Sequence, residues 1–573
     1  MRVTFGISRL SLAVALLVTA TLAATPAVAA HQSPGSSPKV STAVAFDKSP
    51  ALRDLPHAPK VSTRPSPQAG EIRAERGPNA NNTKYLGDGA LQTSASTATL
   101  QTTNTTLSPL GGFEGLNNDD NAALFGRRVN PPDPVGAVGP NHYVEMVNLV
   151  FAVYDKQGTR LAGPFLLGSL FQGFAVTDCS RNAGDPIVLY DRHVNRWILT
   201  QFTSAGPIYF NCVAISQTPD PTGAYFRYAF SSGTFFPDYP KYGVWKDSYT
   251  LTSRDFGPSG EYGISVYSLE KQRMIDGDPD ARMVHFFLDS ATVPIYLMGD
   301  GLLPADVDGW AEPEDGSGVP IVGTMNEGAQ YNAPFDALNI FELHVNWGNL
   351  GAASFGLVKQ IPVAQFTSNF PCTDPINPTA SQTRSCISQP GTTHKIDVLS
   401  YRQRPTWRLA YRKFDTYESM VTNQSVQATP GMAGVRWYEI RRINGQYSLY
   451  QQGTYAPDDE VNRWMGSAAM DKKGNISLGY SVSNATDVFP GIRYTGRLSG
   501  DPLGQMTLGE GVIIKGSGVQ TSLNARWGDY TTMSIDPTDD CTFWYLNEYI
   551  HDTSLSLAPW QTRVASFKLP GCS

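Results

Sequence analysis

The chain has 573 residues, of which 17% are charged and 41% apolar, with 53 glycines and 41 prolines. So small a charged fraction beside so much Gly and Pro excludes a coiled coil, a helical bundle and charge-driven disorder. The 44 Lys and Arg against 51 Asp and Glu leave a net charge of −7, which excludes a nucleic-acid binder that works by neutralising phosphates.

The first 30 residues have the pattern of a secretory signal peptide. Arg2 and Arg9 supply a charged start, residues 10–23 an apolar stretch and residues 27–29 a small-residue cleavage site. The apolar stretch is shorter than the roughly 18 residues that span a bilayer, and no other run of spanning length follows. We therefore predict a secreted, extracellular protein with no membrane span, and we expect a monomer.

Residues 31–110 are rich in Ser, Thr, Pro, Ala, Gly and Asn and contain few large apolar side chains. Such a stretch buries too little surface to offset the entropy of ordering it. We expect a disordered linker or pro-segment here, followed by one folded domain over residues 111–573.

The six cysteines agree with export, because their number is even and none has zinc-finger or CxxC spacing. Six cysteines allow 15 pairings. Sequence proximity favours three local loops, closed by Cys179–Cys212, Cys372–Cys386 and Cys541–Cys572.

From residue 111 onwards, short β-branched and aromatic runs alternate with turn residues, and almost no window has a helical period. Hairpin turns are predicted at Asp155-Lys156-Gln157-Gly158-Thr159 and at Asp471-Lys472-Lys473-Gly474-Asn475, where Gly supplies a positive φ. The body is therefore predicted to be all-β.

A repeated theme decides which all-β fold is favoured. A small or acidic start, an apolar strand, a polar turn and a second strand recur seven times, and successive starts are 52 to 91 residues apart. Units of this length are typical of propeller blades, so we predict a single β-propeller with seven blades; six or eight blades, or a pair of β-sandwiches, are the alternatives. The longest step indicates an insertion or a miscounted blade. The starts are Asp133, Asp185, Asp238, Asp306, Asp397, Trp464 and Trp527.

The repeated Asp is the first candidate site feature. If the theme is in register, Asp133, Asp185, Asp238, Asp397 and Asp529 surround one mouth of the central channel. Clustered carboxylates shift one another's pKa values, which provides an acid and a base from one residue type. Such oxygens also suit Ca²⁺, and no other cofactor is expected. Capping of a turn by each Asp is the alternative.

The second feature is the pair Arg-Trp, which occurs at residues 196–197, 436–437, 463–464 and 526–527. An exposed Arg beside an indole suits a sugar that carries a carboxylate. Packing of the Arg stem against the Trp ring is the alternative, and it is favoured less for Arg463 and Arg526, which precede small inner-strand residues.

Several segments resemble a group of secreted bacterial β-propeller proteins with no assigned activity. They include residues 132–141, 462–471, 492–497, 526–530 and 540–545. A more distant resemblance is to sialidases, because Ser534-Ile535-Asp536 followed by Thr542-Phe543-Trp544 is similar to a degenerate Asp box. That resemblance implies a carboxylate-binding triad of Arg463, Arg493 and Arg526 with Tyr530 as nucleophile. The chain departs from it in blade number and in having no activating Glu.

These observations predict a polar depression at one mouth of the propeller. We expect catalytic roles for Asp529, Tyr530, Asp185 and Asp238, and substrate contacts from Arg463, Arg526, Arg493, Trp464 and Trp527. The predicted function is hydrolysis or elimination on an extracellular polysaccharide. The alternative is a non-catalytic propeller that binds an extracellular glycan or a surface protein.

Overall fold

The computed structural model describes Met1 and residues 37–56, 66–71, 85–94, 107–328, 331–368, 385–398, 403–552 and 556–573. The predicted signal peptide, apart from Met1, and Cys372 lie outside these residues. No helix within the described part of the chain is long and apolar enough to cross a membrane.

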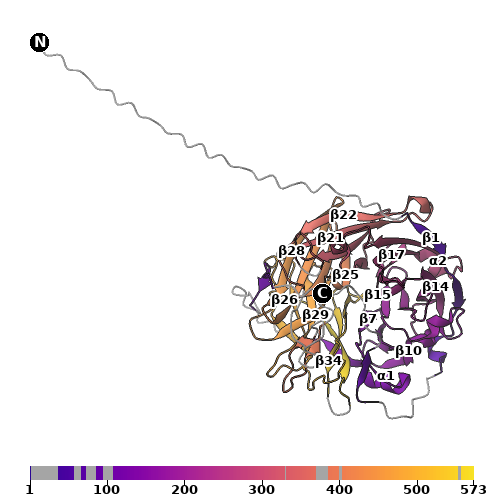
Figure 1. The fold of residues 1–573 in the computed structure, drawn as a ribbon, viewed down its shortest axis with the longest axis horizontal. Coiled ribbons are helices and arrows are strands. Elements are labelled where there is room, and N and C mark those ends of the chain that lie inside the picture. The colour runs from indigo at the N-terminus through magenta and orange to yellow at the C-terminus, as the bar shows by residue number, and fades with distance from the viewer. Residues whose placement is uncertain are drawn as a thin grey trace.

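The described residues form seven antiparallel four-stranded units around a central axis (Figure 1). The innermost strand of each unit contacts the innermost strands of its two neighbours, and the seventh contacts the first, so the ring closes. This architecture is a seven-bladed β-propeller, as the repeat predicts. The fourth and fifth blades are also joined by a parallel pairing of their inner strands.

In each blade the strands are named from the axis outwards. The first blade consists of β7 (Val135–Val138), β8 (His142–Val147), β9 (Val150–Asp155) and β10 (Arg160–Leu166), and the second of β11 (Ile187–Asp191), β12 (Arg196–Phe202), β13 (Tyr209–Ser216) and β14 (Tyr225–Gly233). The third consists of β15 (Phe236–Val244), β16 (Ser248–Phe256), β17 (Tyr262–Glu270) and β18 (Arg282–Asp289), and the fourth of β19 (Leu303–Asp308), β20 (Val319–Met325), β21 (Ala337–His344) and β22 (Ser354–Pro362).

The fifth blade consists, in the same order, of β25 (Thr406–Lys413), β26 (Glu418–Thr429), β27 (Met432–Ile443) and β28 (Gln446–Tyr455). The sixth consists of β29 (Asn462–Met470), β30 (Ile476–Ser483), β31 (Gly491–Arg497) and β32 (Glu510–Ile514). The seventh consists of β33 (Thr532–Ile535), β34 (Phe543–Ile550), β35 (Trp560–Phe567) and β5 (Gly111–Asn117).

Small residues on the inner strands are explained by how closely these strands approach each other at the axis. A Cβ atom added to Gly243 on β15 would lie 2.2 Å from the carbonyl oxygen of Ala305 on β19. The predicted hairpin turns are also present. Asp155 Oδ1 accepts hydrogen bonds from the backbone N–H groups of Gln157 (2.9 Å) and Thr159 (2.8 Å), and Gly158 has a φ of +90°.

The seventh blade closes the ring by joining the two ends of the domain. Its outermost strand, β5, comes from the start of the domain and pairs antiparallel with β35 near the C-terminus. In Figure 1 the yellow end of the chain accordingly lies beside the purple start. Buried Glu145 on β8 ties the first blade to this closure, because its carboxylate accepts from the N–H of Leu116 (3.1 Å) and the hydroxyl of Thr562 (2.6 Å).

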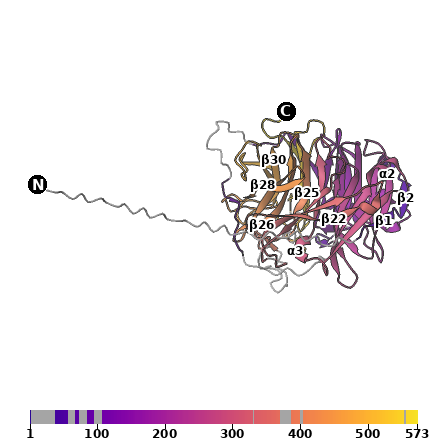
Figure 2. The same cartoon turned by 90° about the horizontal axis from the view of Figure 1, so that it is seen from above.

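Described parts of residues 31–110 differ from the disorder expected there. Strand β1 (Lys39–Thr42) pairs with β18, β2 (Ala45–Lys48) pairs with β14, and β4 (Leu91–Gln92) pairs with β28, each on the outer edge of a blade. Figure 2 shows β1 and β2 on the outer rim beside α2. Pairing with an existing edge strand provides the order that the composition of this segment cannot provide alone.

The remaining elements are short. Residues 363–405, between the fourth and fifth blades, account for the longest step of the repeat. Asp397 therefore lies in a small two-stranded sheet and does not begin an inner strand, which corrects its predicted position. Among the described residues, the short elements outside the blades are three helices, four 3₁₀ turns and two strand pairs. The helices are α1 (Asn118–Phe125), α2 (Lys271–Asp276) and α3 (Ile295–Met298), and the 3₁₀ turns are Leu52–Asp54, Leu167–Phe171, Thr177–Ser180 and Leu350–Ala352. The strand pairs are β3 (Ala69–Glu71) with β6 (Arg128–Asn130) and β23 (Ser385–Ile387) with β24 (Ile396–Asp397).

Two of the three predicted disulfides lie within the described residues. Cys179 is bonded to Cys212 and Cys541 to Cys572. Cys386 is also disulfide-bonded, while its predicted partner Cys372 lies outside the described residues. Disulfides of this kind are typical of proteins from an oxidising compartment.

Candidate functional site

Charged side chains converge at the end of the channel where the inner strands begin, which we call the entry mouth. Asp133, Asp185 and Asp529 lie a few residues before β7, β11 and β33, and Lys241 lies within β15. Arg404 precedes β25 by two residues. Because the inner strands share one direction around the axis, residues far apart in sequence meet at this end.

The backbone at three entry positions has a left-handed conformation. The φ angles of Asp133, Asp185 and Tyr239 are +46°, +45° and +52°, and each residue is followed by proline. Non-glycine residues adopt this region rarely and at a cost in free energy, and such residues cluster at functional sites. The repeated Asp-Pro of the sequence therefore marks a constrained backbone at the entry mouth.

Asp529 pairs with two arginines at the entry mouth. It accepts from Arg526 Nη2 at 2.8 Å and from Arg404 Nη2 at 3.3 Å. Burial alone would raise its pKa, but Arg526, Arg404 and Lys241 together lower it below the ordinary value. The structure thus holds Asp529 in its ionised form.

Asp133 has the opposite behaviour, although it touches the same segment. Its Oδ1 accepts from the backbone N–H of Asp529 at 2.6 Å, and its Oδ2 accepts from Asn148 Nδ2 at 2.7 Å. Burial, followed by repulsion from Asp529 and Asp185, raises the pKa of Asp133 well above its usual range. The pKa values of the two neighbouring acids are therefore shifted in opposite directions.

Lys241 lies fully buried among aromatic rings at the entry mouth. Its Nζ is 3.5 Å from the ring centroid of Tyr239 and 3.7 Å from that of Tyr530. Burial lowers the pKa of Lys241 to about 7. The hydroxyl of Tyr530 donates to the carbonyl of Pro186 at 3.3 Å, and burial raises its pKa, so this phenol is held neutral.

The other two predicted acids lie at the same end of the channel. Half-buried Asp185 accepts from the backbone N–H of Tyr239 through Oδ2 at 3.2 Å. Asp238 lies in an adjacent ion-pair set, with its Oδ2 3.8 Å from Arg254 Nη1; Arg254 in turn is 3.2 Å from Asp300. The structure therefore brings Asp529, Tyr530, Asp185 and Arg526 together, with Asp238 beside them.

Arg463 and Arg493 do not reach the entry mouth. Both pair with Glu510 on the outer strand β32, at 2.7 Å and 3.0 Å, and Arg463 also pairs with Asp459 at 2.7 Å. Arg463 is the second residue of the inner strand β29, but its side chain is directed towards Glu510 on the outermost strand of the blade. The predicted triad with Arg526 is therefore not assembled.

Trp464 and Trp527 pack against each other in the core. Their ring centroids are 5.3 Å apart, and both side chains are buried. The indole Nε1 of Trp527 donates to Ser481 Oγ at 3.0 Å. They stabilise the contact between the last two blades and do not form apolar walls of a depression.

Sequence reasoning overlooked Lys241, Tyr239 and Arg404 as members of this cluster. The segment Asp238-Tyr239-Pro240-Lys241 contains the repeated blade motif. However, the pairing of β15 with β16 shifts its register between Asp238 and Lys241, and this shift, which the motif does not reveal, determines which side chain faces the axis. Within the described residues, no group of three or more His, Cys, Asp or Glu side chains is arranged to hold a metal ion. The Asp residues expected to suit Ca²⁺ are instead neighbours of Arg and Lys.

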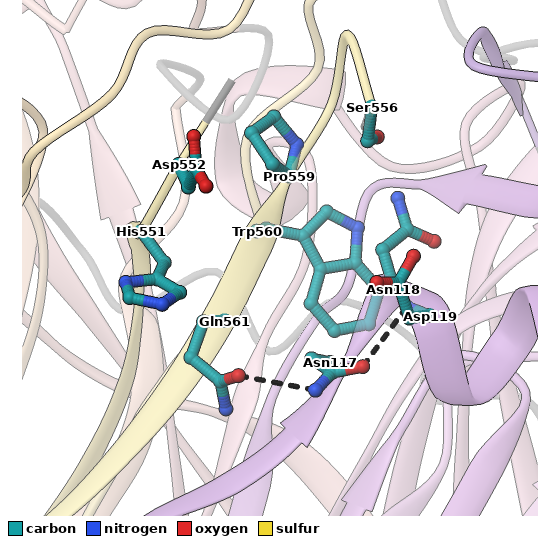
Figure 3. A pocket seen from close by; sticks show the side chains of 9 residues that line it. All are labelled: Asn117, Asn118, Asp119, His551, Asp552, Ser556, Pro559, Trp560 and Gln561. Atoms are coloured by element: carbon teal, nitrogen blue, oxygen red, sulfur yellow. Dashed lines mark hydrogen bonds between the residues drawn. The ribbon is translucent and has the colours of Figure 1, made fainter. Parts of the chain in front are cut away.

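A separate pocket of about 240 Å³ lies on the outer rim, between the start of α1 and the start of β35 (Figure 3). Its amide side chains bind the protein itself: Asn117 caps α1, Asn118 donates to the carbonyl of Ala558, and Gln561 accepts from Asn117. None of the predicted site residues lines it.

Comparisons with known proteins add the following. No family model matches the chain, and no curated protein matches it. Solved structures with partial likeness include a thermostable family-43 glycoside hydrolase (13% identity, 56% of this chain and 94% of that chain, TM-score 0.24) and an α-L-arabinanase of Cellvibrio cellulosa (12%, 54% and 90%, TM-score 0.23). A GH93 α-L-arabinofuranosidase of Fusarium graminearum is a third (8%, 58% and 93%, TM-score 0.27). TM-scores this low carry no inference about activity.

Proposed function

We propose that the chain is a secreted propeller that cleaves an extracellular polysaccharide at the entry mouth, as a hydrolase or a lyase. The observation that carries the proposal is the contact between Asp133 and Asp529, whose pKa values are shifted in opposite directions. Neighbouring titratable groups with such a difference are how one residue type supplies both an acid and a base near neutral pH.

In this proposal Asp133 donates a proton to the leaving oxygen of the glycan as the bond to that oxygen breaks. Asp529, kept ionised by Arg526 and Arg404, acts as the base. In hydrolysis it takes a proton from the water that attacks the anomeric carbon, and in elimination it takes the C5 proton of a uronate as the C4–O bond breaks. Half-buried Asp185, on the neighbouring second blade and joined to Asp133 through Asn148, contacts the substrate beside this pair. Tyr530 positions Lys241 and is not a nucleophile, because its hydroxyl is held neutral and already donates to Pro186.

The second candidate function is a non-catalytic propeller that binds an extracellular glycan or a surface protein. It is favoured by the pairing of Asp529 with two arginines, since a carboxylate held in this way suits a rigid recognition surface as well as catalysis. In both cases the partner is extracellular.

The test is digestion of a panel of neutral and uronate-containing polysaccharides by the purified mature chain. New reducing ends without absorbance near 235 nm indicate hydrolysis, and both signals together indicate elimination. We expect Asp133→Asn to reduce cleavage about 100-fold or more, and the exposed control Asp276→Asn to leave it unchanged. Binding without cleavage of any polysaccharide would replace the enzyme proposal by the second candidate.

A further inference from the structure

Trp310 is the exposed tryptophan of this chain, at 58% exposure, whereas the other nine tryptophans are buried or half-buried. It follows β19 at the end of the channel where the inner strands finish, which we call the exit mouth. His193, which follows β11, lies at the same end. This mouth is opposite the Asp133–Asp529 pair.

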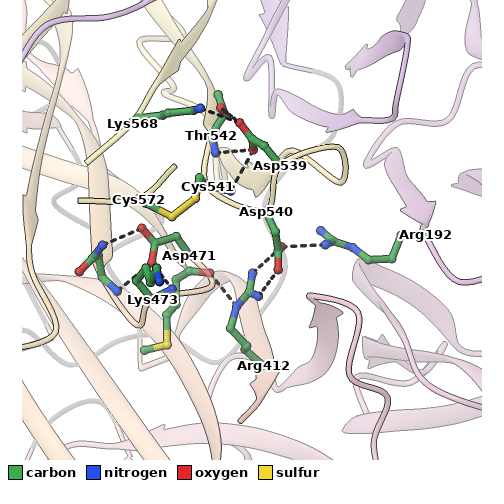
Figure 4. The surroundings of a disulfide bond; sticks show 12 residues. Arg192, Arg412, Asp471, Lys473, Asp539, Asp540, Cys541, Thr542, Lys568 and Cys572 are labelled. Carbon is green, nitrogen blue, oxygen red and sulfur yellow. Dashed lines mark hydrogen bonds and ion pairs between the residues drawn. A yellow bond between two sulfur atoms is a disulfide. The ribbon is translucent and has the colours of Figure 1, made fainter. Parts of the chain in front are cut away.

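The turn that carries Trp310 packs against a buried network of ion pairs. Gly309 has a φ of +80°, and a Cβ atom there would lie 2.6 Å from Arg412 Nη1. Arg412 and Arg192 both pair with Asp540, at 2.6 Å and 2.9 Å (Figure 4). This buried network next to the Cys541–Cys572 disulfide leaves the turn little freedom.

The indole ring is also oriented by two side chains. The guanidinium of Arg192 lies 5.8 Å from the centroid of the Trp310 ring. The imidazole of His193 meets the ring edge-on, with centroids 6.0 Å apart and planes at 81°. A ring held in this way loses little conformational entropy when a ligand stacks on it.

The charges around Trp310 indicate the class of ligand. Arg192, Arg408 and Arg412 are buried and each is paired with Asp306, Asp308 or Asp540. At the surface, Lys246 pairs with Asp315 and Lys413 with Glu314. These cations already have carboxylate partners, which disfavours an acidic sugar, while the exposed carboxylates can accept hydrogen bonds from hydroxyl groups.

We propose that Trp310 is a stacking platform for a neutral sugar ring, so that the exit mouth is a glycan-binding site separate from the entry mouth. The apolar face of the sugar packs on the indole. Its hydroxyl groups bond to His193 and to Glu312, which is two residues after Trp310 and lies 3.6 Å from Lys246 Nζ. The inference goes beyond the proposed function, since it requires no chemistry at Asp133 or Asp529.

The test measures binding of the full mature chain to neutral hexasaccharides of glucose, xylose, mannose, arabinose and galactose, and to oligogalacturonate and choline. We expect at least one neutral hexasaccharide to bind with a Kd that rises about 10-fold or more in Trp310→Ala. Trp310→Phe should retain most of the affinity. The control Leu503→Ala, which removes another exposed apolar side chain, should leave it unchanged.

Three results would overturn the inference. Trp310→Ala could leave the affinity for every neutral hexasaccharide unchanged, or the ligand whose affinity it lowers could be oligogalacturonate, or that ligand could be choline. Asp529→Asn separates this inference from the proposed function. Binding that survives Asp529→Asn but is lost in Trp310→Ala supports the exit-mouth site even if no cleavage is found. Binding lost in Asp529→Asn and kept in Trp310→Ala places the only glycan site at the entry mouth.

Discussion

Asp133 and Asp529 show how position alone makes two identical side chains chemically different. Asp529 faces two guanidinium groups, and Asp133 faces an amide and two other carboxylates. Each carboxyl is buried, so neither interaction is screened by bulk water. The difference in pKa is therefore a property of the entry mouth and cannot be read from either residue.

The protonation of a single residue, Lys241, predicts how the stability of the protein depends on pH. Its pKa is about 7 in the folded chain and near 10.5 when exposed, so between these values the unfolded chain binds more protons. This residue therefore contributes stability that is present above about pH 10.5 and is lost as the pH falls through about 7. We expect wild type to gain stability from pH 7 to 9 relative to Lys241→Met, as measured by thermal unfolding. Parallel pH profiles for the two proteins would contradict a buried, titrating Lys241.

At the scale of elements, residues 37–56 act as a clasp on the rim of the second and third blades. Arg227 on β14 makes two hydrogen bonds of 2.6 Å to Asp47, and Phe46 packs on Tyr228 at 5.0 Å. Leu52 is completely buried in the main core. A segment that contributes a core residue is part of the folded domain.

We therefore expect Leu52→Ala to lower the melting temperature by several degrees, since burying a leucine of this kind is worth about 2–5 kcal/mol. Val44→Ala is the matched control in the same segment, because Val44 is 54% exposed. Equal melting temperatures for the two variants in calorimetry would mean that the clasp is a dispensable linker.

The closure of the ring provides a second prediction for elements. Burial raises the pKa of Glu145 to about 7, above its ordinary value near 4.5. The folded chain then binds the additional proton, so the stability from this group is complete below pH 4.5 and is lost as the pH rises through about 7. Glu145→Gln should reduce the loss of stability between pH 5 and 8, measured by urea unfolding. A loss of the same size in the variant would exclude Glu145 as its source.

At the scale of the whole molecule, the sequence predicts the propeller and its blade number because each inner strand needs small residues and each entry needs a turn former. These requirements are local, so Asp133, Asp185 and the hairpin at Asp155 are visible in the sequence. The prediction that Asp397 begins an inner strand was wrong, because the segment between the fourth and fifth blades contains a similar pattern; its backbone nevertheless forms a bridge to Arg526. The monomer and the signal peptide stay predictions.

The site could be predicted only in part, because the direction of a side chain depends on register and on neighbouring blades. Arg463 and Arg526 have the same sequence context, yet one pairs with Glu510 on an outer strand and the other with Asp529 at the axis. Trp464 and Trp527 follow them and pack between blades. No local pattern separates these outcomes.

The central claim is that the entry mouth is the functional site, and Asp529→Asn tests it most directly. This substitution keeps the shape of the side chain and removes the charge that Arg526 and Arg404 neutralise. The measurement is the rate of glycan cleavage, or the Kd where only binding is found, together with the melting temperature of each protein. We predict that cleavage is abolished or binding weakened at least 10-fold, while the melting temperature changes by only a few degrees. Unchanged glycan activity in a folded variant, or a variant that simply unfolds, would contradict the account.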